Sequence, residues 1–153
     1  YVADTENNLI RTIFLETGQV ETLAGSGYGS NDGVGPSASF QFPKGLALTH
    51  EGDALLVSDK AVDGRVRRVN LQTRGVETLA GNRQTEPRAY FKSPVDVTAS
   101  PLPGGALQIF VADLGHGMLR VLRVAGEREK PQRSALVLID VQDCFLPEGT
   151  TTG

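Results

Sequence analysis

Three aspartates recur along this sequence, and an arginine follows each of them after seven or eight residues. The aspartates are Asp4, Asp59 and Asp113, and the arginines are Arg11, Arg67 and Arg120. Together they could form a ring of charged ligands on one face of a repeated fold. Alternatively, they hold a hairpin together in each repeat, because a carboxylate at a strand end can accept hydrogen bonds from turn N–H groups. We favour the second interpretation, since a structural role predicts recurrence in every unit.

Asp140 is a further acidic candidate in a different context. It follows the continuous apolar run 135–139, which is typical of a strand buried on both faces in a parallel sheet. An acid at the carboxyl end of such a strand is where α/β enzymes place catalytic groups, and burial raises its pKa toward the range useful for proton transfer. The alternative is one more strand of the repeats ending in Asp. Since no alternating Val-Ala-Asp and no following arginine are present, we expect this strand not to pair with the repeats.

Residues that could bind a metal ion or a phosphate are scattered. His50 and His116 lie in predicted turns without a second ligand at metal-binding spacing, so we expect no metal and no cofactor. The glycines between Gly25 and Gly35 are not followed by the strand–GxxxxGK[ST]–helix pattern of a phosphate-binding loop. We interpret them as a connection between repeats.

The elements that position these residues recur every 51 to 56 residues. The string VETLAG begins at Val20 and again at Val76, and Phe42-Pro43 is echoed by Ser93-Pro94. Within one period, turn residues separate four short strand-like stretches: 45–49, 54–59, 65–70 and 75–80. Four short antiparallel strands form the blade of a β-propeller. We therefore predict an all-β fold for residues 1–124, with about ten strands in two and a half blades and no helix longer than one turn.

The recurring residues resemble the NHL repeat family. The matching stretches are Phe42–Ala47, Leu56–Asp59, Val2–Arg11 and the connector from Thr22 to Phe40. The resemblance covers residues 1–124 and implies NHL-type blades of four antiparallel strands, about six of which close a complete propeller. Because this chain supplies only about two and a half, we expect a fragment of a larger protein.

The composition changes after residue 124. Residues 125–133 are rich in charge and contain Pro131, which is typical of a linker. In the next segment, 134–153, the string from Ala135 to Phe145 resembles the opening strand of the isochorismatase-like cysteine hydrolases, which include nicotinamidases. The resemblance implies the first strand of an α/β parallel-sheet domain, with Asp140 in an Asp–Lys–Cys catalytic set and Phe145 in the substrate pocket. The lysine and the nucleophilic cysteine of that set are absent from this chain.

The composition of the chain argues against two classes of protein, nucleic-acid binders and membrane-spanning proteins. The net charge of −3 argues against nucleic-acid binding, and no apolar run is long enough to cross a membrane. The single cysteine, Cys144, fits an intracellular, cytoplasmic location. We expect a protein-interaction scaffold, with other chains or the rest of its own protein covering the open propeller edges. The alternative is a cysteine hydrolase acting on C–N or vinyl-ether bonds, with the propeller as its targeting module.

Overall fold

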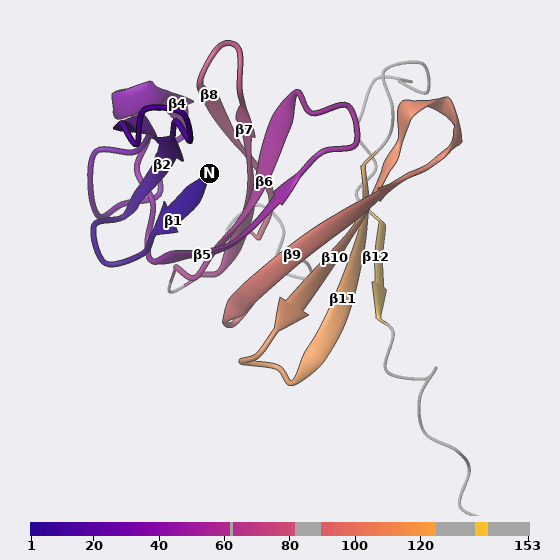
Figure 1. The fold of residues 1–153 in the computed structure, drawn as a ribbon. Coiled ribbons are helices and arrows are strands. Elements are labelled where there is room, and N and C mark those ends of the chain that lie inside the picture. The colour runs from indigo at the N-terminus through magenta and orange to yellow at the C-terminus, as the bar shows by residue number, and fades with distance from the viewer. Residues whose placement is uncertain (62, 82–89, 125–136, 141–153) are drawn as a thin grey trace, which may run out of the picture.

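The computed structural model describes residues 1–61, 63–81, 90–124 and 137–140. Their regular structure consists of β-strands and two 3-10 turns of three residues each, η1 (Gly35–Ser37) and η2 (Pro103–Gly105). Neighbouring strands pair antiparallel in every sheet (Figure 1). The predicted all-β fold is therefore confirmed, and the described residues contain no helix longer than one turn.

The strands form three sheets that follow one another along the chain. The first sheet consists of β1 (Val2–Asp4), β2 (Leu9–Ile13) and β3 (Val20–Ala24). The second has β5 (Pro43–Leu48), β6 (Ala54–Asp59), β7 (Arg65–Asn70) and β8 (Gly75–Ala80), with the two-residue β4 (Gly33–Val34) outside β8. The third has β9 (Pro94–Pro101), β10 (Leu107–Asp113), β11 (Met118–Val124) and β12 (Val137–Asp140). We call these sheets blades 1, 2 and 3, because their order and pairing are consistent with NHL-type blades.

The strand that ends at Asp140 was expected to stay apart from the repeats, and this expectation is wrong. Val137–Asp140 forms β12, which pairs antiparallel with β11, with Arg120 opposite Asp140 and Arg123 opposite Val137. β12 is thus the fourth strand of blade 3, next to β11, as β8 is the fourth strand of blade 2, next to β7. The physical reason is that a short apolar run does not by itself distinguish a parallel strand from an antiparallel one. The free edge of β11 also offers unpaired N–H and C=O groups that a further strand can satisfy.

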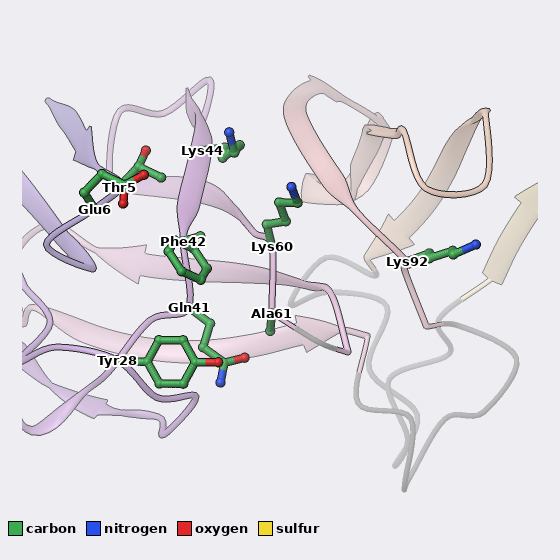
Figure 2. Close-up of a pocket in the computed structure, with 9 residues that line it drawn as sticks. All are labelled: Thr5, Glu6, Tyr28, Gln41, Phe42, Lys44, Lys60, Ala61 and Lys92. Carbon is green, nitrogen blue, oxygen red and sulfur yellow. The ribbon is translucent and has the colours of Figure 1, made fainter.

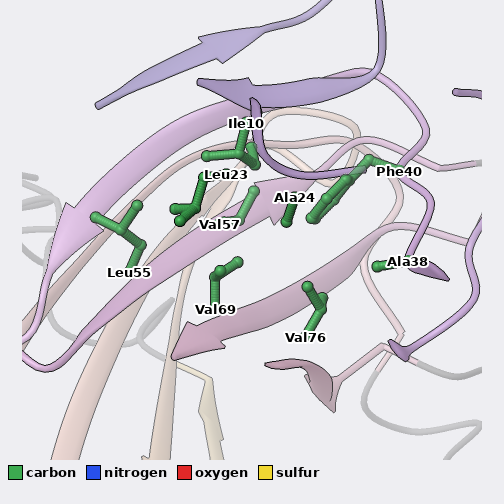
Figure 3. Packing of buried hydrophobic residues seen from close by; sticks show 9 residues of the cluster. All are labelled: Ile10, Leu23, Ala24, Ala38, Phe40, Leu55, Val57, Val69 and Val76. Atoms are coloured by element: carbon green, nitrogen blue, oxygen red, sulfur yellow. The ribbon is translucent and has the colours of Figure 1, made fainter. Parts of the chain in front are cut away.

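Two apolar cores lie between the blades. The core between blades 1 and 2 is shown in Figure 3 and contains nine buried side chains: Ile10, Leu23, Ala24, Ala38, Phe40, Leu55, Val57, Val69 and Val76. The second core includes Leu56 from blade 2 and Val97, Ile109 and Val111 from blade 3. Successive side chains of a strand point to opposite faces, so β6 contributes Leu55 and Val57 to one core and Leu56 to the other. All six residues of β6 are buried, as expected for a strand covered on both faces.

The glycine that ends each copy of VETLAG is required by the backbone. Gly25 and Gly81 have φ angles of +105° and +102°, a region that residues with a side chain rarely adopt. A Cβ atom on Gly81 would clash with the carbonyl oxygen of Gly64, and one on Gly25 would lie 2.8 Å from that of Asn8. This glycine therefore recurs because the backbone turns sharply, with little free space around it, directly after β3 and directly after β8.

Candidate functional site

Asp59 fixes the segment that leads into β5, the first long strand of blade 2. Its side chain is fully buried at the end of β6. One carboxylate oxygen accepts a 2.7 Å hydrogen bond from the backbone N–H of Gln41, and the other lies 3.1 Å from the guanidinium of Arg67. The carboxylate therefore ties together the segment before β5, the end of β6 and the middle of β7.

Asp113 plays the same part in blade 3. It is also fully buried, and it accepts backbone hydrogen bonds from Lys92 and Ser93, the latter at 2.8 Å. Its second oxygen lies 2.7 Å from the imidazole Nδ1 of His116 and 3.8 Å from the guanidinium of Arg120. The segment before β9 is thus held as the segment before β5 is.

In blade 1, Asp4 is more open to solvent. It lies 3.0 Å from Arg11 and accepts a 2.8 Å hydrogen bond from the side-chain amide of Asn7. The structure therefore brings all three aspartates to their arginines. In blades 2 and 3, however, the carboxylates bind backbone N–H groups of the connecting segment rather than of the hairpin turn that follows. The oxygens of Asp59 and Asp113 are occupied inside the protein, which leaves them poorly placed to act as ligands for another molecule.

The buried arginines carry a second feature that the sequence pattern did not reveal. The guanidinium of Arg67 stacks on Phe40 at 5.1 Å and also binds Asp32 at 2.8 Å, and that of Arg120 stacks on Phe91 at 5.2 Å. A cation over an aromatic face is attracted by the ring quadrupole, most strongly where water is excluded. The recurrence of phenylalanine at positions 40 and 91 was the signal that could have found this contact.

The three aspartates differ in pKa for physical reasons. Burial raises the pKa of Asp59 to about 6, against the lowering effects of the Gln41 N–H and Arg67. Burial also acts upward on Asp113, but hydrogen bonds from His116, Ser93 and Lys92 outweigh it and lower its pKa. Hydrogen bonds from Asn7 and Arg11 lower the pKa of Asp4. Of the three, only Asp59 titrates near the range useful for proton transfer, and it is enclosed.

The segments held by these aspartates line a hollow of about 470 Å³ that spans the ends of the blades. Its lining, shown in Figure 2, is Thr5, Glu6, Tyr28, Gln41, Phe42, Lys44, Lys60, Ala61 and Lys92. Thr5 and Glu6 follow Asp4, Lys60 follows Asp59, and Gln41 and Lys92 donate their N–H groups to Asp59 and Asp113. The repeated aspartates therefore act as supports for the hollow. We call it the lysine hollow, after Lys44, Lys60 and Lys92.

An aromatic pair stands on one side of the lysine hollow. The rings of Tyr28 and Phe42 meet edge to face at 5.8 Å, and both side chains are exposed. Phe42 has a φ of +57°, which is uncommon for a residue with a large side chain. Its backbone is held in this conformation by a 2.8 Å hydrogen bond to the side chain of Asn8 and by a bond from the Lys60 N–H. The fold thus maintains an unfavourable backbone angle at a ring that faces solvent.

Other candidate residues do not assemble into a site. His50 is exposed, and His116 contacts Asp113 and the Tyr90 hydroxyl. Within the ranges that the structure describes, no three His, Cys, Asp or Glu side chains gather as possible metal ligands. No helix in the described ranges is long and apolar enough to cross a membrane. Asp140 ends β12, and Phe145 lies outside the described residues.

Comparison with proteins of known sequence gives several relatives. The chain is 29% identical over 137 residues to Protein SUPPRESSOR OF QUENCHING 1, chloroplastic, of Arabidopsis thaliana. It is also 29% identical over 136 residues to the Homo sapiens NHL repeat-containing protein 2. These matches cover 80% of this chain but only 12% and 18% of the relatives. The Gallus gallus NHL repeat-containing protein 2 is 26% identical and matches 97% of this chain, and therefore extends past residue 124.

Solved structures agree on the fold. A Bacteroides thetaiotaomicron protein of unknown function superposes with a TM-score of 0.60 at 21% identity, over 72% of this chain and 28% of its own. An auxiliary nutrient binding protein from Bacteroides ovatus gives 0.56 at 16% identity, over 76% of this chain and 32% of its own. No family model matches the chain. The blades and the sequence relatives together show that the chain is homologous to NHL repeat-containing proteins over most of its length.

Proposed function

We propose that this chain is a protein-binding module of the NHL propeller type, and that the lysine hollow is where its partner binds. The observation that carries the proposal is the exposed aromatic pair Tyr28 and Phe42 beside a hollow of about 470 Å³. Aromatic side chains are enriched among the residues that dominate protein interfaces, because they bury large areas at low entropic cost. The buried aspartates give these residues a rigid support, which reduces the cost of ordering the site on binding.

The alternative of a cysteine hydrolase has less support. It rests on the short string from Ala135 to Phe145, of which the structure describes only residues 137–140. Those residues form the outer strand of blade 3 rather than the first strand of a parallel sheet. With the lysine and cysteine of the catalytic set absent from the sequence given, we assign no reaction to Asp140.

The proposal can be tested by photo-crosslinking in the natural full-length protein. Tyr28 is replaced by benzoylphenylalanine, and the matched control carries the same group at Leu48. Leu48 is exposed as well, but it lies at the opposite end of β5 from the hollow. We expect position 28 to crosslink one defined protein, confirmed by reciprocal purification, and position 48 not to do so. Identical adducts from both positions, or none from position 28, would overturn the proposal.

A further inference from the structure

The lysine hollow also indicates what kind of partner it takes. Resting on the proposed function, we infer that the partner contributes an acidic peptide segment. Its carboxylates would face Lys44, Lys60 and Lys92, and an aromatic side chain between them would pack on Tyr28 and Phe42. The inference rests on the distribution of lysine in the chain, on the lack of internal partners for these lysines, and on the exposed rings beside them.

Lysine is concentrated at this one place. The sequence contains four lysines, at positions 44, 60, 92 and 130, and the first three line the hollow. They come from different parts of the fold: Lys44 lies in β5, Lys60 follows β6, and Lys92 precedes β9. A protein with a net charge of −3 thus presents a local cationic surface where segments distant in sequence meet.

These three lysines form no ion pair within the described part of the chain. All three are exposed, and none has a carboxylate within ion-pair distance among the described residues. The arginines differ, because Arg11, Arg67, Arg68 and Arg120 are paired with aspartates. Among the described residues that line the hollow, Glu6 is the one with a carboxylate. The lysines therefore remain available to an anionic ligand. Glu6 would repel the part of such a ligand that carries negative charge close to it.

The aromatic pair favours a peptide over a simple anion. An inorganic anion gains nothing from Tyr28 and Phe42, whereas an aromatic side chain can pack edge to face on them. Three separated point charges also match side-chain carboxylates spaced along an extended segment. Lysine, unlike arginine, does not impose the bidentate geometry that phosphate recognition often uses. The net negative charge of the chain further disfavours a long nucleic acid.

The test uses the natural full-length protein and fluorescence anisotropy. The probe is a fluorescein-labelled peptide of sequence GEDFDEG, compared with GKRFRKG, with GEDADEG and with single-stranded oligothymidylate. We expect GEDFDEG to bind more tightly than the other three and to weaken as salt is raised, because salt screens exposed charges. The double variant Lys44→Glu/Lys60→Glu should weaken binding by about tenfold. Arg74→Glu, at a position that is also exposed but lies outside the hollow, should leave binding within about twofold.

The outcomes separate this inference from the proposed function. If oligothymidylate binds as tightly as GEDFDEG, or if the lysine variant binds the peptide unchanged, the inference is overturned. A specific crosslink at position 28 together with no preference for acidic peptides would leave the protein-binding function standing and refute only the acidic partner. Conversely, tight peptide binding without any protein crosslink would count against the function and not against the chemistry of the hollow.

Discussion

The backbone N–H of Gln41 donates a 2.7 Å hydrogen bond to the carboxylate of Asp59, which lies eighteen residues later in the sequence. In blade 3 the N–H of Ser93 donates to Asp113 across twenty residues, at 2.8 Å. Each bond joins the end of the second strand of a blade to the segment that leads into the first. The same contact thus closes the blade and positions the residues that line the hollow.

Removing the Asp59 carboxylate should destabilise blade 2 strongly. Asp59→Ala leaves the buried guanidinium of Arg67 with the half-exposed Asp32 as its remaining carboxylate, beside the carbonyl oxygens of Asn31 and Ser39, and leaves the Gln41 N–H without its acceptor. Breaking one side of a buried ion pair costs about 3–5 kcal/mol. The check is hydrogen exchange of residues 40–48, followed by mass spectrometry in the full-length protein. Asp4→Ala, in a partly buried pair that is more open to solvent, should give a much smaller effect, and equal effects of the two variants would contradict the argument.

The raised pKa of Asp59 predicts a definite dependence on pH. With a folded value of about 6 against an ordinary value of 3.8, the proton binds more tightly in the folded state. The stability contributed by this proton is fully present below pH 3.8 and is lost as the pH rises through about 6. Relative to Asp59→Asn, the protein should therefore lose up to about 3 kcal/mol between pH 4 and pH 7, at about 1.4 kcal/mol per pKa unit.

The control for this pH dependence is Asp53→Asn. The Thr49 hydroxyl and Arg68 lower the pKa of Asp53, so its contribution is constant above pH 3.8 and falls only below that value. The measurement is hydrogen exchange of residues 40–48, corrected for the intrinsic effect of pH on exchange. The difference in stability between the unsubstituted protein and Asp59→Asn should change between pH 4 and pH 7, whereas the difference from Asp53→Asn should stay constant. If the difference from Asp59→Asn is also constant, Arg67 keeps Asp59 ionised throughout this pH range.

The strands of the blades could be predicted from the sequence because their signals are local. The stretches 54–59, 65–70 and 75–80 coincide with β6, β7 and β8, since short Val- and Leu-rich runs between turn residues specify strands without reference to the rest of the fold. Such a signal carries no information about the strand's partner. For that reason β12 was assigned to a different sheet, although its position as a strand was correct.

The lysine hollow could not be predicted because no local pattern marks it. Lys44, Lys60 and Lys92 are single charges separated by 16 and 32 residues, and each alone resembles an ordinary surface residue. Their proximity results from how the blades stack. Phe42 has a left-handed backbone angle that its sequence context does not reveal, because a residue before proline usually adopts an extended conformation. The aspartates that support the hollow were found because they recur in each blade. Recurrence marks residues that every blade needs for its structure, and the lysines of the hollow do not recur in this way.

The left-handed backbone of Phe42 predicts which substitutions the fold accepts. Asparagine tolerates a φ near +57°, whereas a β-branched residue does not, so Phe42→Val should cost about 1–2 kcal/mol and Phe42→Asn should cost less. Because the side chain is only 38% exposed, both variants also lose part of the burial free energy of the ring, which adds to either value. Hydrogen exchange of residues 40–48 measures the difference. If both variants behave alike, the conformation at this position is not strained.

The chain should not be stable as an isolated monomer, because the outer face of blade 1 is apolar and uncovered. Val2, Ile13 and Val20 are exposed there, and they help to line a hollow of about 560 Å³. Each aliphatic side chain left in water forgoes about 1.5–3 kcal/mol of burial free energy, and the whole margin of a domain is about 5–15 kcal/mol. Repeat proteins also need about three units with covered ends before their core outweighs the entropy of ordering. The measurement is thermal unfolding of residues 1–153 by circular dichroism. A soluble monomer with a cooperative transition above about 45 °C, the usual range for mesophilic domains, would refute the prediction.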